Sequence, residues 1–182
     1  ISCFTLDGDP VWKQDFFTVG RGLPFLHKGR IVFTRQIYTP EKNGRFPHKY
    51  ANAPKEMWTQ LQALDIKTGR ISWTTECGIN MGVSVIPQKT SDGREVVVTG
   101  RGGGHGPPEK PQGISLVDLT NGKTLWTLPI EKFSATMSFG IRNNQVHFFH
   151  GPNHLSVDAV TGKIMKRVSL IKDVPVCLWN NG

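Results

Sequence analysis

Three histidines lie close together in one short segment of the chain. His147, His150 and His154 form an H-x2-H-x3-H pattern within HFFHGPNH. Imidazole nitrogens at such spacing can bind Zn²⁺ or Cu²⁺. The segment is also typical of a β-hairpin, in which His147 and His150 face opposite sides of a strand unless the turn brings one of them round. No cysteine or carboxylate joins them before Asp158, so the hairpin is favoured and the three histidines remain candidate ligands.

A glycine-rich run at residues 100–108, GRGGGHGPP, holds two side chains suited to an anion, Arg101 and His105. It matches neither GxGxxG nor GxxxxGK[ST], and it does not open a helix, so a phosphate loop is not predicted. We interpret it as a loop between two strands. Because such loops often line ligand sites, Arg101 and His105 are candidate binding residues.

The segment 38–58, YTPEKNGRFPHKYANAPKEMW, interleaves aromatic side chains with lysines and arginines, Arg45 and Tyr50 among them. Aromatic and cationic side chains together bind sugars or bases by stacking and charge. Its prolines and turn-forming residues favour an ordinary surface excursion. Arg45 and Tyr50 are therefore candidates for a ligand loop.

Charge is concentrated in one part of the chain. Twenty-two Lys and Arg against 14 Asp and Glu give a net charge of +8, and residues 21–55 alone contribute +7. Such a stretch attracts anionic polymers, although basic residues on solvated loops give the same pattern. Cys3, Cys77 and Cys177 form no CxxC pair, which excludes a zinc or redox motif. Their neighbours in the sequence favour three small buried residues in strands.

Composition indicates the fold class. No run of about 18 uncharged apolar residues is present, and the first residues lack a basic start followed by an apolar stretch, so neither a membrane helix nor a signal peptide is expected. With 20 Gly and 12 Pro, the chain suits short strands joined by tight turns. It contains no GxSxG and no HExxH motif, and no catalytic residue is assigned. An all-β fold is predicted.

A repeat organises the chain. The segment 63–73, ALDIKTGRISW, recurs as LVDLTNGKTLW at 116–126, as SVDAVTGKIMK at 156–166, and in compressed form as CFTLDGDPVW at 3–12. The third of these has Lys166 where the others have Trp. The residues shared by the copies are Asp65, Thr68, Gly69 and Trp73; Asp118, Gly122 and Trp126; Asp158, Thr161 and Gly162; and Trp12.

Each copy predicts a β-hairpin. An apolar strand ends at an aspartate whose carboxylate accepts hydrogen bonds from turn amides, and Thr and Gly complete the turn. The aspartates are thus turn residues before they are candidates for catalysis. The Trp at the end of the hairpin offers a flat apolar face on which a neighbouring repeat can stack.

Further strands are expected between the hairpins, at 29–37, 95–100 and 145–149, with preceding strands at 83–86, 135–139 and 174–179. The repeat aspartates are 53 and 40 residues apart. This brackets the roughly 40 to 50 residues of a four-stranded propeller blade.

The frame A-x-D-x-x-T-G-x-x-x-W resembles the tryptophan-docking repeat of the pyrroloquinoline-quinone-like (quinoprotein alcohol dehydrogenase-like) β-propeller family. The resemblance implies about three full four-stranded blades plus partial blades at both ends. Its segments are a closing hairpin at 1–19, blades at 20–77, 78–128 and 134–170, and an opening strand at 171–182. It implies a segment of a longer propeller, completed by other blades or by a second chain. Trp58 and Trp179 stay unassigned.

Function is implied by the resemblance alone. It implies a non-catalytic binding or scaffolding module outside the cytoplasm, periplasmic or secreted, with a protein or glycan partner. Nucleic acid is not favoured. The alternatives are part of a quinone-dependent dehydrogenase, with PQQ and Ca²⁺, or a propeller that binds carbohydrate or an anionic polymer. The adjacent cysteines of several such dehydrogenases do not occur here.

Overall fold

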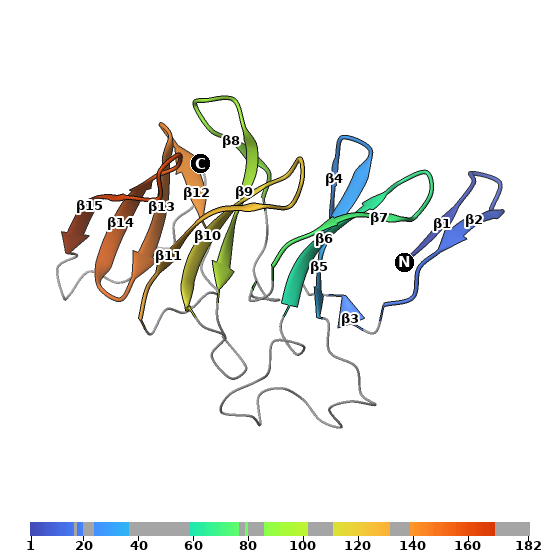
Figure 1. Cartoon of the computed structure of the whole chain (residues 1–182), viewed down its shortest axis with the longest axis horizontal. Coiled ribbons are helices and arrows are strands. Elements are labelled where there is room, and N and C mark those ends of the chain that lie inside the picture. The colour runs from blue at the N-terminus through green and yellow to red at the C-terminus, as the bar shows by residue number, and fades with distance from the viewer. Residues whose placement is uncertain are drawn as a thin grey trace, which may run out of the picture.

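The computed structural model describes residues 1–16, 18–19, 24–36, 59–76, 79, 86–101, 111–131 and 139–169 of the 182. Their regular structure is entirely β-strand, arranged in four antiparallel sheets that follow one another in chain order (Figure 1). No helix among these residues is long and apolar enough to cross a membrane. The predicted all-β class is confirmed.

In every sheet the hydrogen-bonded neighbours are antiparallel. The first sheet consists of β1 (Ser2–Phe4) and β2 (Pro10–Lys13). The second consists of β3 (Thr18–Val19), β4 (Phe25–His27), β5 (Arg30–Gln36), β6 (Thr59–Asp65) and β7 (Ile71–Thr74). The third consists of β8 (Gln88–Lys89), β9 (Glu95–Arg101), β10 (Gly113–Asp118) and β11 (Thr124–Pro129). The fourth consists of β12 (Gly140–Arg142), β13 (Gln145–His150), β14 (Asn153–Asp158) and β15 (Ile164–Ser169).

The second sheet has five strands in four rows. β3 and β4 both pair with β5, β3 at Gln36 and Arg35 and β4 at Val32 to Arg30, so together they form one interrupted edge. β3 lies inside the segment 1–19, yet it belongs to the same sheet as β5. The third and fourth sheets have four strands each, as expected of blades.

Two of the predicted strands, 83–86 and 135–139, are described only at their last residue. Ile86 and Phe139 lie outside strands, and the edge strands in the described residues are β8 and β12. β12 is followed by a tight turn in which Asn143 and Asn144 take positive φ of 50° and 59°, and the residues immediately before this turn pair with β13. The rest of 83–86 and 135–139, and all of 174–179, lie outside the described residues.

The apolar core lies between the sheets. Val97 on β9 packs with Val32, Leu61 and Trp73 of the second sheet. Its neighbours Val96 and Val98 point the other way and pack with the fourth sheet. Strand alternation thus covers both faces of the third sheet. In contrast, β15 is exposed along its whole length.

One cysteine departs from expectation. Cys3, predicted to be buried, is half-buried on β1, because the two-stranded sheet at that end is itself largely exposed. Cys77 and Cys177 lie outside the described residues.

Candidate functional site

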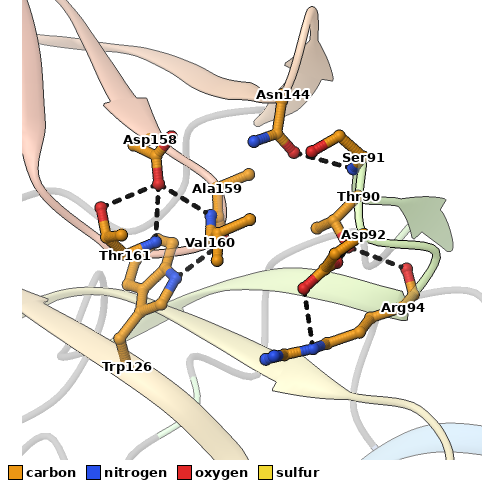
Figure 2. Close-up of polar contacts among 10 residues, drawn as sticks. All are labelled: Thr90, Ser91, Asp92, Arg94, Trp126, Asn144, Asp158, Ala159, Val160 and Thr161. Carbon is orange, nitrogen blue, oxygen red and sulfur yellow. Dashed lines mark hydrogen bonds and ion pairs between the residues drawn. The ribbon is translucent and has the colours of Figure 1, made fainter.

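The hairpin turns of the repeats share a regular polar arrangement in the part of the chain that the structure describes. Asp65 Oδ1 accepts hydrogen bonds from the Thr68 N–H and hydroxyl, both at 2.8 Å. Asp158 Oδ1 accepts from the Thr161 N–H at 2.7 Å and its hydroxyl at 2.8 Å (Figure 2). In both turns a further backbone N–H, two residues after the aspartate, donates at 3.1 Å. A single carboxylate oxygen therefore holds each turn closed.

These hydrogen bonds act on the charge of the aspartates. The Thr68 hydroxyl, followed by the Thr68 N–H, lowers the pKa of Asp65. The Thr161 hydroxyl and N–H lower the pKa of Asp158 in the same way. Both groups are therefore ionised at neutral pH and serve as acceptors in the turn, a different task from general acid catalysis.

The middle repeat is closed differently. Asp118 Oδ1 accepts from the Thr120 N–H at 2.7 Å. Asn121 stands where the other turns have Thr, and its side-chain oxygen accepts from the Lys123 N–H at 2.8 Å. The backbone bond from the Gly122 N–H to the Asp118 carbonyl remains, at 2.8 Å. The turn keeps its backbone shape while losing the hydroxyl-to-carboxylate bond.

Each tryptophan ring of the repeats lies against the turn glycine of the next sheet. The pairs are Trp12 with Gly69, Trp73 with Gly122 and Trp126 with Gly162. A Cβ added to Gly122 would lie 2.5 Å from the Trp73 ring, and its φ of +74° already disfavours other residues. Glycine is therefore required twice over, by the backbone and by the neighbouring ring.

The indole N–H groups of the three tryptophans differ in whether they donate a hydrogen bond within the described residues. Trp12 Nε1 donates to the Ile66 carbonyl at 2.9 Å, and Trp126 Nε1 donates to the Ala159 carbonyl at 3.0 Å (Figure 2). Both acceptors follow the turn aspartate directly. The buried Trp73 Nε1 has no hydrogen-bond partner in the described part of the chain. Among the described residues, packing in the core between the second and third sheets holds that ring.

Further polar contacts join adjacent sheets, and the sequence analysis did not identify them. His27 Nε2 lies 3.3 Å from Glu95 Oε2, which also pairs with Lys28. The Ser91 N–H donates to Asn144 Oδ1 at 2.9 Å, as Figure 2 shows. Each pair joins residues more than 50 positions apart in different repeats, so no local motif could have indicated it.

The structure brings two of the three candidate histidines together. His147 Nδ1 and His154 Nε2 are 3.3 Å apart, and the rings stack at a centroid distance of 5.3 Å. Burial first, and then the charge of His154, lowers the pKa of His147. His150 lies three residues along β13 from His147, in register with Asn153, and so on the opposite side. The described residues contain no group of three or more His, Cys, Asp or Glu placed to hold one metal ion.

Arg101, the candidate anion ligand, is the last residue of β9. Its Nη1 lies 2.9 Å from Glu76 Oε1, and its side chain is 6% exposed. The guanidinium is thus engaged by a carboxylate within the protein. His105, Arg45, Tyr50, Trp58 and Trp179 lie outside the described residues.

Successive antiparallel sheets, three of which carry a turn aspartate and glycine and two of these also a terminal tryptophan, define the chain as a β-propeller protein built from PQQ-like repeats. The family model described as "Outer membrane protein assembly factor BamB" matches residues 2–170, and the chain belongs to this family.

Two solved structures are similar to the chain. The computationally designed Ika8 protein is 13% identical, with a TM-score of 0.48, over 90% of this chain and 41% of its own. BamB from Moraxella catarrhalis is 12% identical, with a TM-score of 0.36, over 91% of this chain and 58% of its own. The chain thus spans between two fifths and three fifths of their lengths. No curated protein matches it.

Proposed function

We propose that the chain is a non-catalytic binding or scaffolding module of a β-propeller outside the cytoplasm, periplasmic or secreted. Membership of the family described by an outer membrane protein assembly factor supports this proposal. Under it, the module presents a surface to a protein or glycan partner and contributes blades to a larger ring.

One observation carries the proposal: the polar groups of the repeats are committed to building the blades. The carboxylates of Asp65 and Asp158 hold their turns, and Trp12, Trp73 and Trp126 join one sheet to the next. We propose that these residues form the interlock between blades. A rigid array of blades suits a scaffold, whose task is to hold its surface loops in fixed positions.

The alternative function, part of a quinone-dependent dehydrogenase, requires a different set of side chains. It requires ligands for Ca²⁺, which prefers six to eight oxygens. The described residues offer no cluster of that kind, since Asp65 and Asp158 already close turns. They do not fit the cofactor, and we derive no chemistry from it.

The first test adds PQQ and CaCl₂ to the full chain and records the visible absorbance and the reduction of an electron-acceptor dye with alcohols or sugars. Under the proposal, neither the spectrum nor the dye rate differs from a boiled sample. Saturable quinone binding with dye reduction would contradict it. Detection of the native protein in the periplasmic or secreted fraction tests the location.

The local net charge of +7 in residues 21–55 favours a second candidate, an anionic-polymer binder. Retention on immobilised heparin tests it. A specific binder would elute earlier as salt rises, and the variant with Lys42, Arg45, Lys49 and Lys55 all changed to Gln would lose retention. Changing Lys13, Lys67, Lys123 and Lys163 to Gln removes the same charge elsewhere and serves as the control.

A further inference from the structure

Two histidine nitrogens face each other on one side of the fourth sheet. His147 Nδ1 and His154 Nε2 are 3.3 Å apart. The two rings are parallel to within 8°, and their centroids are 5.3 Å apart, farther than the two nitrogens. The nitrogens therefore lie on the facing edges of the two rings. When both rings are neutral, one of these nitrogens donates a proton and the other accepts it.

The register of the sheet places both rings on the same face. Phe149 pairs with His154 across β13 and β14, and His147 lies two residues before Phe149 on the same strand. Alternate residues of a strand share a face. Val146 and Phe148 point the other way, into the core shared with the third sheet. The two histidines therefore lie on the face of the fourth sheet that is turned away from the third.

Contacts within the fourth sheet hold the two rings in place. The Phe149 ring lies 5.3 Å from the His154 ring, tilted by 55°. The His147 ring has a hydrogen bond with the backbone of Arg142, the last residue of β12. Metal-bound histidines are commonly oriented by an outer contact of this kind to the backbone. Both histidines are half-buried, so the protein positions them while solvent still reaches them.

The separation of the two nitrogens matches that of two ligands on one metal ion. Zn²⁺ binds imidazole nitrogens at about 2.0 to 2.1 Å in a tetrahedral arrangement, which places two such nitrogens about 3.3 to 3.4 Å apart. The distance of 3.3 Å between His147 Nδ1 and His154 Nε2 falls in this range. An ion beside the line that joins the two nitrogens would thus meet both at bonding distance.

We propose that His147 and His154 form a two-histidine binding site for a divalent transition metal such as Zn²⁺, with water in the remaining ligand positions. On binding, the ion takes the place of the proton between the two nitrogens, which is released to solvent, and each imidazole donates one lone pair. This inference goes beyond the proposed function, because a scaffold requires no metal.

The ligands and the nearby charge define which ions the site takes. Imidazole suits Zn²⁺, Cu²⁺ and Ni²⁺, and Cu²⁺ is expected to bind more tightly than Zn²⁺. Mg²⁺ and Ca²⁺ prefer oxygen ligands. The positive charge of Arg142 also acts on His147, which disfavours an ion held by charge alone. The site should therefore discriminate against Mg²⁺ and Ca²⁺.

Isothermal titration calorimetry of the full chain with ZnCl₂ at neutral pH tests the site. His147→Gln and His154→Gln each remove one imidazole, and each should weaken Zn²⁺ binding at least about tenfold. His150→Gln is the matched control, because it removes the same residue type from the opposite face of β13 and should leave Zn²⁺ binding unchanged. MgCl₂ should give no binding heat. Circular dichroism checks that each variant is folded.

Nuclear magnetic resonance of the unchanged chain identifies the ligand atoms without any substitution. In long-range ¹H–¹⁵N spectra of the imidazole rings, one equivalent of Zn²⁺ should shift the Nδ1 resonance of His147 and the Nε2 resonance of His154. Both nitrogen resonances of His150 should stay where they are.

Three results would overturn the proposal. The first is Zn²⁺ binding that is equally strong in His147→Gln and His154→Gln, which would place the ligands elsewhere in the chain. The second is an equal loss of binding in His150→Gln. The third is an unchanged chain that shows neither binding heat nor nitrogen shifts with Zn²⁺, in which case the two histidines serve only to join β13 to β14. Because these measurements use no quinone, dye or heparin, their failure is distinguishable from failure of the proposed function.

Discussion

Two turns of the third sheet each contain a glycine with positive φ, but the two glycines differ in which neighbouring atoms lie against them. Gly93, between β8 and β9, has φ of +87° and nothing of the described structure within 4 Å of an added Cβ. Gly122, between β10 and β11, has φ of +74° and the Trp73 ring against it. In the described structure, only the conformation of its own turn constrains the residue at position 93. At position 122 the Trp73 ring of the neighbouring sheet is a second constraint. The same residue type is therefore required by tertiary packing at one of the two sites.

Removing the Trp73 ring should have the largest effect on the free energy of unfolding. Trp73 is 8% exposed and belongs to the core between the second and third sheets. We expect Trp73→Ala to reduce the free energy of unfolding by about 3 to 5 kcal/mol, because it leaves a large cavity. Equilibrium urea unfolding measures the change. Ile71→Ala, two residues away at a 48% exposed position, is the control and should cost under about 1 kcal/mol.

Adding a methyl group to each glycine tests the comparison directly. Gly122→Ala forces a Cβ against the Trp73 ring and a residue with a side chain into positive φ. We expect a loss of about 3 kcal/mol, the sum of overpacking and backbone strain. Gly93→Ala carries the strain alone and should lose about 1 kcal/mol. Equal losses in urea unfolding would show that the ring yields and that the turn conformation decides both sites.

Replacing indole by phenyl distinguishes the two ways in which the rings are held. Trp126→Phe removes the 3.0 Å hydrogen bond to the Ala159 carbonyl. Trp73→Phe removes an N–H without a hydrogen-bond partner in the described structure. We expect Trp126→Phe to cost about 1 kcal/mol more than Trp73→Phe in the same unfolding assay. A larger loss at Trp73 would mean that burial outweighs the hydrogen bond.

The smallest effect is that of acid on the turn aspartates. Hydrogen bonds, the Thr161 hydroxyl first, lower the pKa of Asp158 below its ordinary value. Because the folded pKa is the lower one, this carboxylate stabilises the fold above about pH 4, and the contribution disappears as pH falls through the folded pKa. It amounts to under about 1 kcal/mol after allowance for solvent screening.

Asp158→Asn should therefore destabilise the protein at pH 7 and have no effect near pH 2, as measured by urea unfolding at both values. Thr161→Val should show part of the same pH dependence, since it removes the hydroxyl donor. A loss that is unchanged at low pH would assign the effect to the turn geometry and not to the charge.

Local sequence predicted the turns well. The Asp-x-x-Thr-Gly frame indicated a hairpin at 63–73 and at 156–166, and the Thr68 and Thr161 hydroxyls bond to their aspartates there. The predicted run at 95–100 corresponds to β9. The predicted strands 83–86 and 135–139 lie outside the described residues except for Ile86 and Phe139, and the short edge strands β8 and β12 follow them. The positive φ of Asn143 and Asn144 closes the turn after β12.

The candidate sites were less predictable than the fold. The spacing of the three histidines said nothing about which faces they share, and strand register placed His154 beside His147 and turned His150 away. Arg101, interpreted as a loop residue, is the end of β9 and pairs with Glu76, 25 positions earlier. Neither partner could be inferred from neighbours in the chain.

The sequence by itself determined the repeat, the hairpin turns and the need for glycine at them, because these depend on residues within about ten positions of each other. Only the tertiary structure decided which glycine each tryptophan covers and that the core lies between sheets. The physical reason is distance along the chain. A turn is closed by bonds among its own residues, whereas a ring and its glycine come from different sheets, 36 to 57 positions apart, and meet only when the sheets pack.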